Sequence, residues 1–276
     1  MELQIIAIFC ICDDMLKKYK HKDNQQVKMT TSEVMTTMLV ASFYFKGNVE
    51  LSRIFLHDHR YIPNMLSKSR LNRRLHSIDI SLWYTLFSIF AEIFKQNQDT
   101  NEFIVDSCPV PVCQNIRIKR CKIYKGEQYR GYIASKRVYF YGLRVHLLVT
   151  SDGKPIEFIL ATGAASDLPI LKQFDLDIPK NSIIYADKLY NDYEFEDFLQ
   201  EWADISFKPL RKKNSKRAYK PWQQFIYQCT RKRVETSLGQ IINLMPRTIH
   251  AVSQKGFALK LICFIVAFSF DTFFNM

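Results

Sequence analysis

Residues 138–161 read VYFYGLRVHLLVTSDGKPIEFILA, and this stretch decides the fold. Two runs rich in β-branched and aromatic residues flank the dipeptide Asp152-Gly153, a pair that favours a tight turn between antiparallel strands. The stretch therefore predicts a β-hairpin. From about residue 102 onward the apolar residues alternate with a period of two, whereas before it they follow a helical period. We therefore expect a helical N-terminal region followed by a sheet.

Two aspartates each follow a short apolar run that is typical of a buried strand. Residues 103–105 read FIV and precede Asp106, and residues 183–186 read IIYA and precede Asp187. We expect both aspartates at strand ends, where ladder hydrogen bonds fix the backbone and leave the side chain at the rim of the sheet. A third acid, Glu235, lies among basic residues on a predicted long helix.

Helices are predicted on both sides of these strands. A capping-box pattern starts a helical region over residues 30–97. A short helix is expected from Asp167, because an acidic residue suits the start of a helix, and residues 192–203 predict an acidic helix. Residues 261–270 are apolar throughout and predict a core helix. A long helix over about residues 222–245 is predicted to bury Val234, Leu238, Ile241 and Met245.

The charge of the chain indicates a polyanionic partner. The formal net charge is +12 and the pI is about 9.3, which suits nucleic acid or an anionic membrane surface. Because the apolar runs near the two ends are too short to cross a bilayer, we expect nucleic acid and no membrane. Seven cysteines without a Cys-x-x-Cys pair indicate free thiols in a reducing compartment such as the cytoplasm.

Part of this positive charge lies on one predicted helix near the N-terminus. Residues 60–76 carry five Lys or Arg residues and no acid, on an amphipathic helix that follows shorter helices. This order resembles a helix-turn-helix DNA reader, with Arg70, Arg73 and Arg74 as candidate DNA contacts. A solvated face on a helical bundle is the alternative, and the sequence leaves both open.

A second basic segment, residues 205–233, carries ten Lys or Arg residues and no acid. We interpret it as a clamp on the DNA backbone that is loosely ordered without DNA, because its charges repel one another. Trp222 and Tyr219 are candidates for stacking on an unpaired base, with a place in the core as the alternative for Trp222. The candidate DNA-binding residues in and before this segment are Lys188, Lys208, Arg211, Lys212, Lys213, Lys216, Arg217, Lys220 and Arg231.

Asp106, Asp187 and Glu235 have the chemistry of a metal-dependent phosphoryl-transfer site. Mg²⁺ prefers oxygen ligands and is commonly held by a few carboxylates, water and substrate phosphate. Two such ions roughly 3.5–4 Å apart activate an attacking oxygen and stabilise the leaving one. Simpler roles stay open for each acid: an aspartate can cap a turn, and Glu235 can pair with Arg231 four residues earlier.

Five stretches resemble DDE-type transposases of bacterial insertion sequences, nearest to the insertion-sequence 982 family. Four lie around the acids: FIVDSCPVPVC at 103–113, YFYGLRVHLLV at 139–149, YADKLY at 185–190 and RKRVETSLGQI at 231–241. The fifth, LSKSRLNRRLH at 66–76, is similar to the N-terminal region of that family. Their consistent order makes the resemblance more specific than any single motif.

The resemblance implies a ribonuclease-H-like α/β fold, a mixed sheet flanked by helices, and we divide the chain into a helix-turn-helix-like helical region, 1–98, and a catalytic domain, 99–276. It assigns Asp106, Asp187 and Glu235 as catalytic residues that hold two Mg²⁺ ions, with Mn²⁺ as a substitute. The implied reaction is DNA cleavage at element ends and strand transfer into target DNA. A homo-oligomer would perform it on terminal inverted repeats, in the bacterial cytoplasm at the nucleoid.

The sequence departs from the family pattern at three positions. Ala186 and Leu189 stand where the second motif usually has glycines, and Ile242 stands where the glutamate motif has a lysine. The three acids themselves are retained. Two alternatives to a transposase stay open: a catalytically inactive, transposon-derived DNA-binding protein, and a metal-dependent nuclease without strand transfer.

Overall fold

The computed structural model describes residues 1–134 and 136–276, which form two compact units. Unit 1 contains Met1–Phe90 and Ile241–Met276, and unit 2 contains Ala91–Gln240. The first junction lies close to the division at 98/99 that the sequence indicates. Residues 241–276, which the sequence placed in the sheet domain, instead pack with the N-terminal helices.

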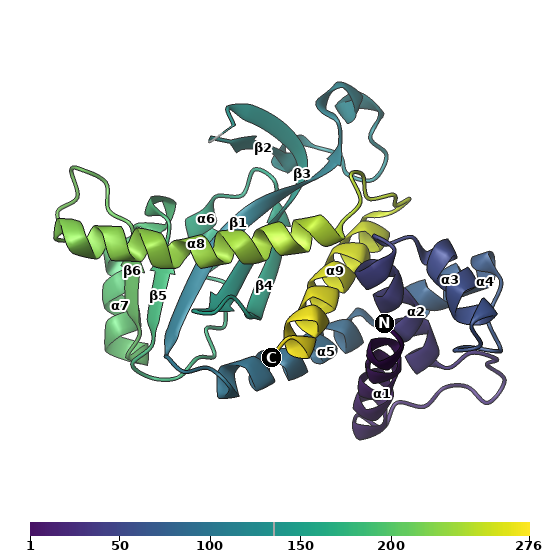
Figure 1. Cartoon of the computed structure of the whole chain (residues 1–276). Helices are drawn as coiled ribbons and strands as arrows, with labels where there is room; N and C mark the ends of the chain where they lie inside the picture. The colour runs from purple at the N-terminus through teal and green to yellow at the C-terminus, as the bar shows by residue number, and fades with distance from the viewer. Residues whose placement is uncertain (135) are drawn as a thin grey trace. The chain divides into compact units, whose positions relative to one another are not determined.

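Unit 1 is helical (Figure 1). Thr30 and Glu33 form the expected capping box, in which each side chain accepts a hydrogen bond from the backbone N–H of the other. The first helix was not predicted, because its apolar run is short. The helices of the unit are α1 (Glu2–Lys18), α2 (Thr31–Tyr44), α3 (Val49–Asp58), α4 (Lys68–Ser77), the first part of α5 (Ile80–Gln96), and α9 (Gln254–Phe274).

Helix α9 forms the core of unit 1. It packs against α2, and the rings of Phe90 and Phe270 meet edge to face with their centroids 4.5 Å apart. By length and composition α9 could cross a membrane. Residues 261–270 are all buried inside the protein, however, which is the pattern of a core helix that is apolar on every side. The predicted core helix is confirmed, and its apolar surface explains why other helices enclose it.

Unit 2 holds one mixed sheet (Figure 1). Antiparallel β4, β3 and β1 continue into the parallel pair β5 and β6, and the short β2 also pairs with β3. Apart from β2, this is the strand order of a ribonuclease-H-like sheet, as predicted. The strands are β1 (Glu102–Cys113), β2 (Arg130–Ile133), β3 (Val138–Thr150), β4 (Pro155–Thr162), β5 (Ile183–Ala186) and β6 (Ser206–Pro209).

Strands β3 and β4 form the predicted hairpin. Thr150 O accepts a hydrogen bond from Gly153 N at 2.9 Å, and Thr150 N donates to Lys154 O at 2.9 Å. Gly153 has a φ of +92°, which residues with a side chain rarely adopt. The turn therefore requires glycine at this position, as the Asp-Gly pair indicated.

The prediction that Asp106 ends its strand is wrong. β1 continues beyond it and stays paired with β3 as far as Cys113. Its pairing with β5, in contrast, stops at Ile104. Proline is tolerated in a strand where its missing N–H faces no neighbouring strand, which explains how Pro109 and Pro111 fit into β1. Asp106 thus lies inside a strand but at the rim of the parallel half of the sheet.

Helices cover both faces of this sheet. Successive residues of a strand point to opposite faces, so Asp106 contacts α8 whereas Ser107 contacts Asp167 at the start of α6. Asp187 follows β5 directly, as predicted. The helices are α6 (Asp167–Leu171), α7 (Tyr193–Ala203) and α8 (Pro221–Leu244), with short 3-10 turns η1 (Asn115–Arg120), η2 (Glu127–Tyr129) and η3 (Lys188–Tyr190).

Helix α8 crosses the sheet and is fastened to it at two points (Figure 1). The ring of Tyr227 packs against Tyr185 on β5, with 5.2 Å between centroids. Ten residues farther along the helix, Ser237 Oγ donates a hydrogen bond to Gly153 O of the hairpin turn at 2.7 Å. Residues 231–235 lie between these two anchors and are therefore held over the sheet.

We expect Gly153→Ala to destabilise the protein by about 1–3 kcal/mol, because the backbone is in the left-handed region. The new Cβ would also lie 2.7 Å from Ser237 Oγ. The matched control is Gly239→Ala on α8, where a Cβ meets nothing within 4 Å and should stabilise the helix by about 0.5–1 kcal/mol. Urea denaturation followed by circular dichroism measures both. Equal midpoints for the two variants would contradict the close contact between the turn and α8.

Candidate active site

Arg231 of α8 lies among the three acids that the sequence singled out. Its Nη2 donates to Asp106 Oδ2 at 2.8 Å and to Glu235 Oε1 at 2.9 Å, and its Nη1 donates to Asp187 Oδ1 at 3.4 Å. Asp106 comes from β1, Asp187 follows β5, and Glu235 lies one turn along α8. Folding therefore gathers acids from three distant parts of the sequence around one guanidinium.

Burial and charge shift the pKa values of these groups in opposite ways. Burial raises the pKa of Asp106 above its ordinary value and outweighs the charge of Arg231, while the charge of Asp187 adds a smaller rise. Desolvation is thus the main cause of the raised pKa of Asp106, and repulsion between the acids is a minor one. Burial alone would lower the pKa of Arg231, yet the charges of Asp106, Asp187 and Glu235 hold it above its ordinary value. Arg231 is thus a permanent cation.

The donor set suits a hard divalent cation. Carboxylate oxygens are the ligands that Mg²⁺ and Mn²⁺ prefer, and the side chains of Asp106 and Asp187 are only 16% and 22% exposed. Throughout residues 1–134 and 136–276, however, no three His, Cys, Asp or Glu side chains are grouped so that they could hold a metal, because the guanidinium sits between the acids. The carboxylate oxygens are therefore suitable ligands for divalent ions, whereas the present spacing of the three acids suits the guanidinium of Arg231.

A buried polar network lies beneath the acids, on the other face of the sheet. Ser107 Oγ donates to Asp167 Oδ1 at 2.8 Å, and the Tyr190 hydroxyl is 3.5 Å from His146 Nδ1. Burial, and to a lesser degree the charge of Arg144, lowers the pKa of His146 to about 3, so its imidazole is neutral. The network joins the residues next to Asp106 and the turn after Asp187. Sequence reasoning missed it, although strand alternation could have placed Ser107 and His146 on one face.

The sequence pattern of one family, described as a transposase DDE domain, matches residues 96–251. The chain belongs to this transposase DDE domain family. The matched region contains Asp106, Asp187, Arg231 and Glu235. A cryo-electron microscopy structure of the piggyBac transposase synaptic complex with hairpin DNA is similar at 12% sequence identity and a TM-score of 0.47, covering 97% of this chain and 72% of that chain. No curated protein sequence matches the chain.

The basic segment 205–233 of the transposase domain has acidic partners on α7. Arg211 forms a bidentate pair with Glu196 of α7, with Nη2 2.6 Å from Oε2, and Arg217 pairs with Asp197 at 2.6 Å. The side chains of Arg211 and Glu196 are 6% and 7% exposed. These pairs could not be predicted from the charges of the segment, because the segment itself holds no acid. The acids come from the preceding helix, which folding places alongside.

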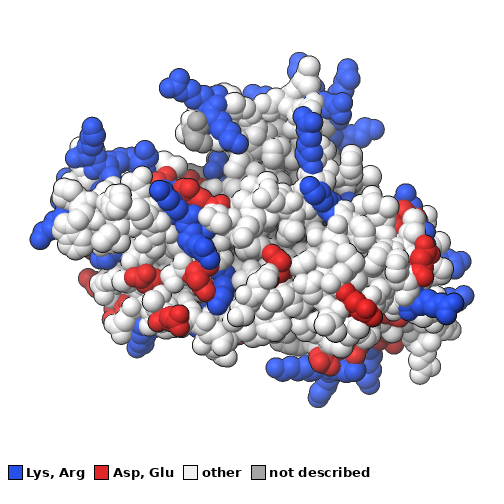
Figure 2. Space-filling view, in the orientation of Figure 1, with Lys and Arg blue, Asp and Glu red and all other residues white. Residues whose placement is uncertain are grey.

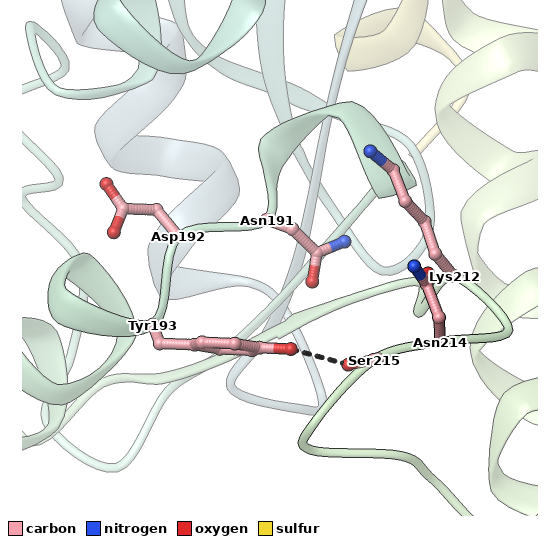
Figure 3. Close-up of a pocket in the computed structure, with 6 residues that line it drawn as sticks. All are labelled: Asn191, Asp192, Tyr193, Lys212, Asn214 and Ser215. Atoms are coloured by element: carbon pink, nitrogen blue, oxygen red, sulfur yellow. Dashed lines mark hydrogen bonds between the residues drawn. The ribbon is translucent and has the colours of Figure 1, made fainter.

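A pocket of about 180 Å³ lies where this segment meets the start of α7 in the transposase domain (Figure 3). The Tyr193 hydroxyl and Ser215 Oγ are 2.7 Å apart across it, and the Arg217 guanidinium lies 4.8 Å from the centre of the Tyr193 ring. Asp192 in its wall pairs with Lys172. These contacts fasten the loop to α7. The pocket is lined by Asn191, Asp192, Tyr193, Lys212, Asn214 and Ser215.

The lysines of the segment remain without acidic partners in the part of the transposase domain that the structure describes. Lys and Arg side chains project at the end of unit 2 that carries the loop between β6 and α8 (Figure 2). Lys188 is exposed directly after Asp187. The ion pairs of this region involve Arg211 and Arg217 and none of Lys208, Lys212, Lys213, Lys216 and Lys220.

The two aromatic candidates of the transposase domain differ in their exposure. Trp222 is 59% exposed, so the core interpretation is wrong for it and base stacking stays a prediction. Tyr219 packs edge to face on Tyr227, with 5.0 Å between centroids, and Arg211 lies over its ring at 4.8 Å. Tyr219 therefore belongs to the scaffold that holds α8.

Outside the transposase domain, the predicted DNA reader lies on α4. Arg70 and Arg73 are exposed there. Arg74 instead donates to Asp23 Oδ1 at 2.6 Å and to Thr31 Oγ1 at 3.1 Å, within unit 1. Two of the three arginines are therefore available for an outside partner.

Sequence reasoning did not single out one further group of basic residues in the transposase domain. They are exposed on and just after η1, next to the extended end of β1. Residues 117–125 carry several positive charges close together, but this pattern alone indicates only a basic loop. The residues are Arg117, Lys119, Arg120, Lys122 and Lys125.

We expect Glu196→Gln to lower the free energy of unfolding by about 3 kcal/mol or more, because it leaves the charge of Arg211 buried without an acidic partner. Asp197→Asn is the matched control, since the Asp197–Arg217 pair is 53% and 44% exposed and should be worth at most about 1 kcal/mol. Chemical denaturation compares the two variants. A decrease of similar size in both would show that the Arg211 pair does not hold the loop.

Proposed function

We propose that this chain is an insertion-sequence transposase, nearest to the insertion-sequence 982 family. It cleaves DNA at the ends of its element and joins the freed 3′ ends to target DNA. The observation that carries the proposal is the gathering of Asp106, Asp187 and Glu235 around one cation-binding position, inside a transposase DDE domain. The enzyme would act as a homo-oligomer on DNA, in the bacterial cytoplasm at the nucleoid.

Asp106, Asp187 and Glu235 would hold two Mg²⁺ or Mn²⁺ ions. When bound, such ions activate the attacking oxygen and stabilise the leaving one. The chain supplies the rigidity: strand backbones fix the two aspartates, and the anchors of α8 fix the glutamate. In the first step water attacks a phosphodiester, the bond from phosphorus to the 3′ oxygen breaks, and a 3′-hydroxyl and a 5′-phosphate result. In the second step that 3′-hydroxyl attacks a phosphodiester of the target strand. The bond from the target phosphorus to its 3′ oxygen breaks, so that the two strands are joined and a target 3′-hydroxyl is released.

The distribution of charge supports DNA as the substrate. The exposed lysines of residues 212–220, together with Lys188, lie on segments that follow β6 and β5 and so approach the acids from one end of the sheet. Basic residues without acidic partners attract phosphates and bind every DNA sequence about equally. Arg70 and Arg73 on α4 would instead read the terminal inverted repeats.

We expect Asp106→Asn, Asp187→Asn and Glu235→Gln each to lower Mg²⁺-dependent cleavage of the element's own flanking DNA ends by about a thousandfold. Loss of a metal ligand removes several kcal/mol of transition-state stabilisation. Glu201→Gln, an exposed acid on α7, is the control and should leave cleavage unchanged. Denaturing gels separate nicked from joined strands.

The products decide between the competing functions. Joined strands require a transposase, whereas nicks without joined strands would indicate a metal-dependent nuclease. Unchanged binding with no cleavage by the natural chain would indicate a DNA-binding protein derived from a transposon.

Replacing Lys212, Lys213, Lys216 and Lys220 together by glutamine should weaken binding to all DNA sequences about equally. The slope of log affinity against log salt should fall by about 0.9 for each phosphate that the protein no longer neutralises. The double change of Arg70 and Arg73 to alanine serves as the contrast, because it should weaken binding most on terminal-repeat DNA. Fluorescence anisotropy on specific and random duplexes measures both. An effect confined to the repeat in the lysine variant would show that the segment reads bases.

A further inference from the structure

The guanidinium of Arg231 occupies the position that divalent ions would need. Nη2 contacts two of the acids and Nη1 the third, and the Arg231 side chain is only 15% exposed. The neighbouring Lys232 and Arg233 of the same helix are exposed to solvent. Arg231 is therefore the basic residue of this turn that is directed into the site.

We infer that Arg231 is the built-in cation of the metal-free site and must withdraw before divalent ions bind, so that metals and this guanidinium compete for Asp106, Asp187 and Glu235. The inference rests on the proposed function, because it takes these acids as the metal site. Arg231 acts as a positioning residue, since it holds the carboxylates together until ions replace it.

Two observations support displacement over a permanent bridge. The guanidinium contacts a carboxylate oxygen of each of the three acids, so an ion can be held by all three only after the guanidinium has left. In addition, Arg231 Nε is buried without a hydrogen-bond partner, and an unsatisfied buried donor disfavours the bridged state.

Release of Arg231 would also couple metal binding to DNA binding. A free guanidinium on α8, one turn from Glu235, is suited to pair with a phosphate in a bidentate manner. DNA would then stabilise the withdrawn state, and by linkage it would raise the affinity for metal. The protein without DNA would bind metal weakly, which would restrain its chemistry until the substrate is present.

The test is titration of Mn²⁺ into the DNA-free, full-length protein by calorimetry. We expect Arg231→Gln to bind Mn²⁺ about tenfold or more tightly than the natural chain, which is within the range of typical coupling between sites. Lys232→Gln, which removes the same charge from the next, exposed position, should bind as the natural chain does. Arg231→Lys keeps the charge but places it on one nitrogen, whereas the guanidinium reaches the acids with two. Its affinity should therefore be intermediate. This variant keeps the test possible if the glutamine variant folds poorly.

The thermal midpoint gives a second readout. Arg231→Gln should melt earlier than the natural chain without metal, because the acids repel one another, and should recover more on addition of Mn²⁺. Natural affinity for Mn²⁺ in both Arg231 variants would overturn the competition. Asp106→Asn separates this failure from that of the proposed function: if it binds Mn²⁺ as tightly as the natural chain, the acids are not the metal site.

Discussion

Neutralisation of three converging carboxylates is the constraint on which unit 2 depends. Two unit charges about 4 Å apart near a protein surface interact by about 4 kcal/mol, and a whole domain is stable by only about 5–15 kcal/mol. Convergence of Asp106, Asp187 and Glu235 therefore costs free energy that a cation between them offsets. Arg231 supplies that charge, and it does so from the same helix that carries Glu235. The position of α8 over the sheet and the partial neutralisation of the three acids therefore depend on the same helix.

The sequence predicted those features of this arrangement that depend on local signals. The Asp-Gly hairpin, the strand before Asp187 and the acidic start of α7 rest on neighbouring residues, and each is found where expected. The course of β1 beyond Asp106 could not be predicted in this way. Pairing with β3 on one side of β1 continues after pairing with β5 on the other side has ended. Tertiary pairing decided the length of this strand.

The ion pairs of the basic segment could likewise not be predicted from the charges along the sequence. A count of charges along residues 205–233 finds no acid, yet folding places the acids of α7 beside Arg211 and Arg217. The arginines rather than the lysines of the loop take these partners, which agrees with the planar, forked geometry of guanidinium groups. The lysines, as flexible point charges, stay exposed. The arginines therefore hold the loop in place, and the lysines form an exposed positive surface. A count of total charge does not distinguish these two roles.

The structure shows what the three departures from the family pattern do to the backbone around Asp187 and to the charge of α8. Glycine is favoured where φ is positive, but Ala186 and Leu189 are not among the residues with positive φ. Ala186 is buried in β5 opposite Pro209 of β6, where a small side chain fits, and Leu189 is 58% exposed on η3. Neither change therefore strains the turn that presents Asp187. Ile242 is different in kind, because an isoleucine cannot donate a hydrogen bond or carry charge to a phosphate. The pattern loses one cationic group at this position while the geometry that gathers the acids stays intact.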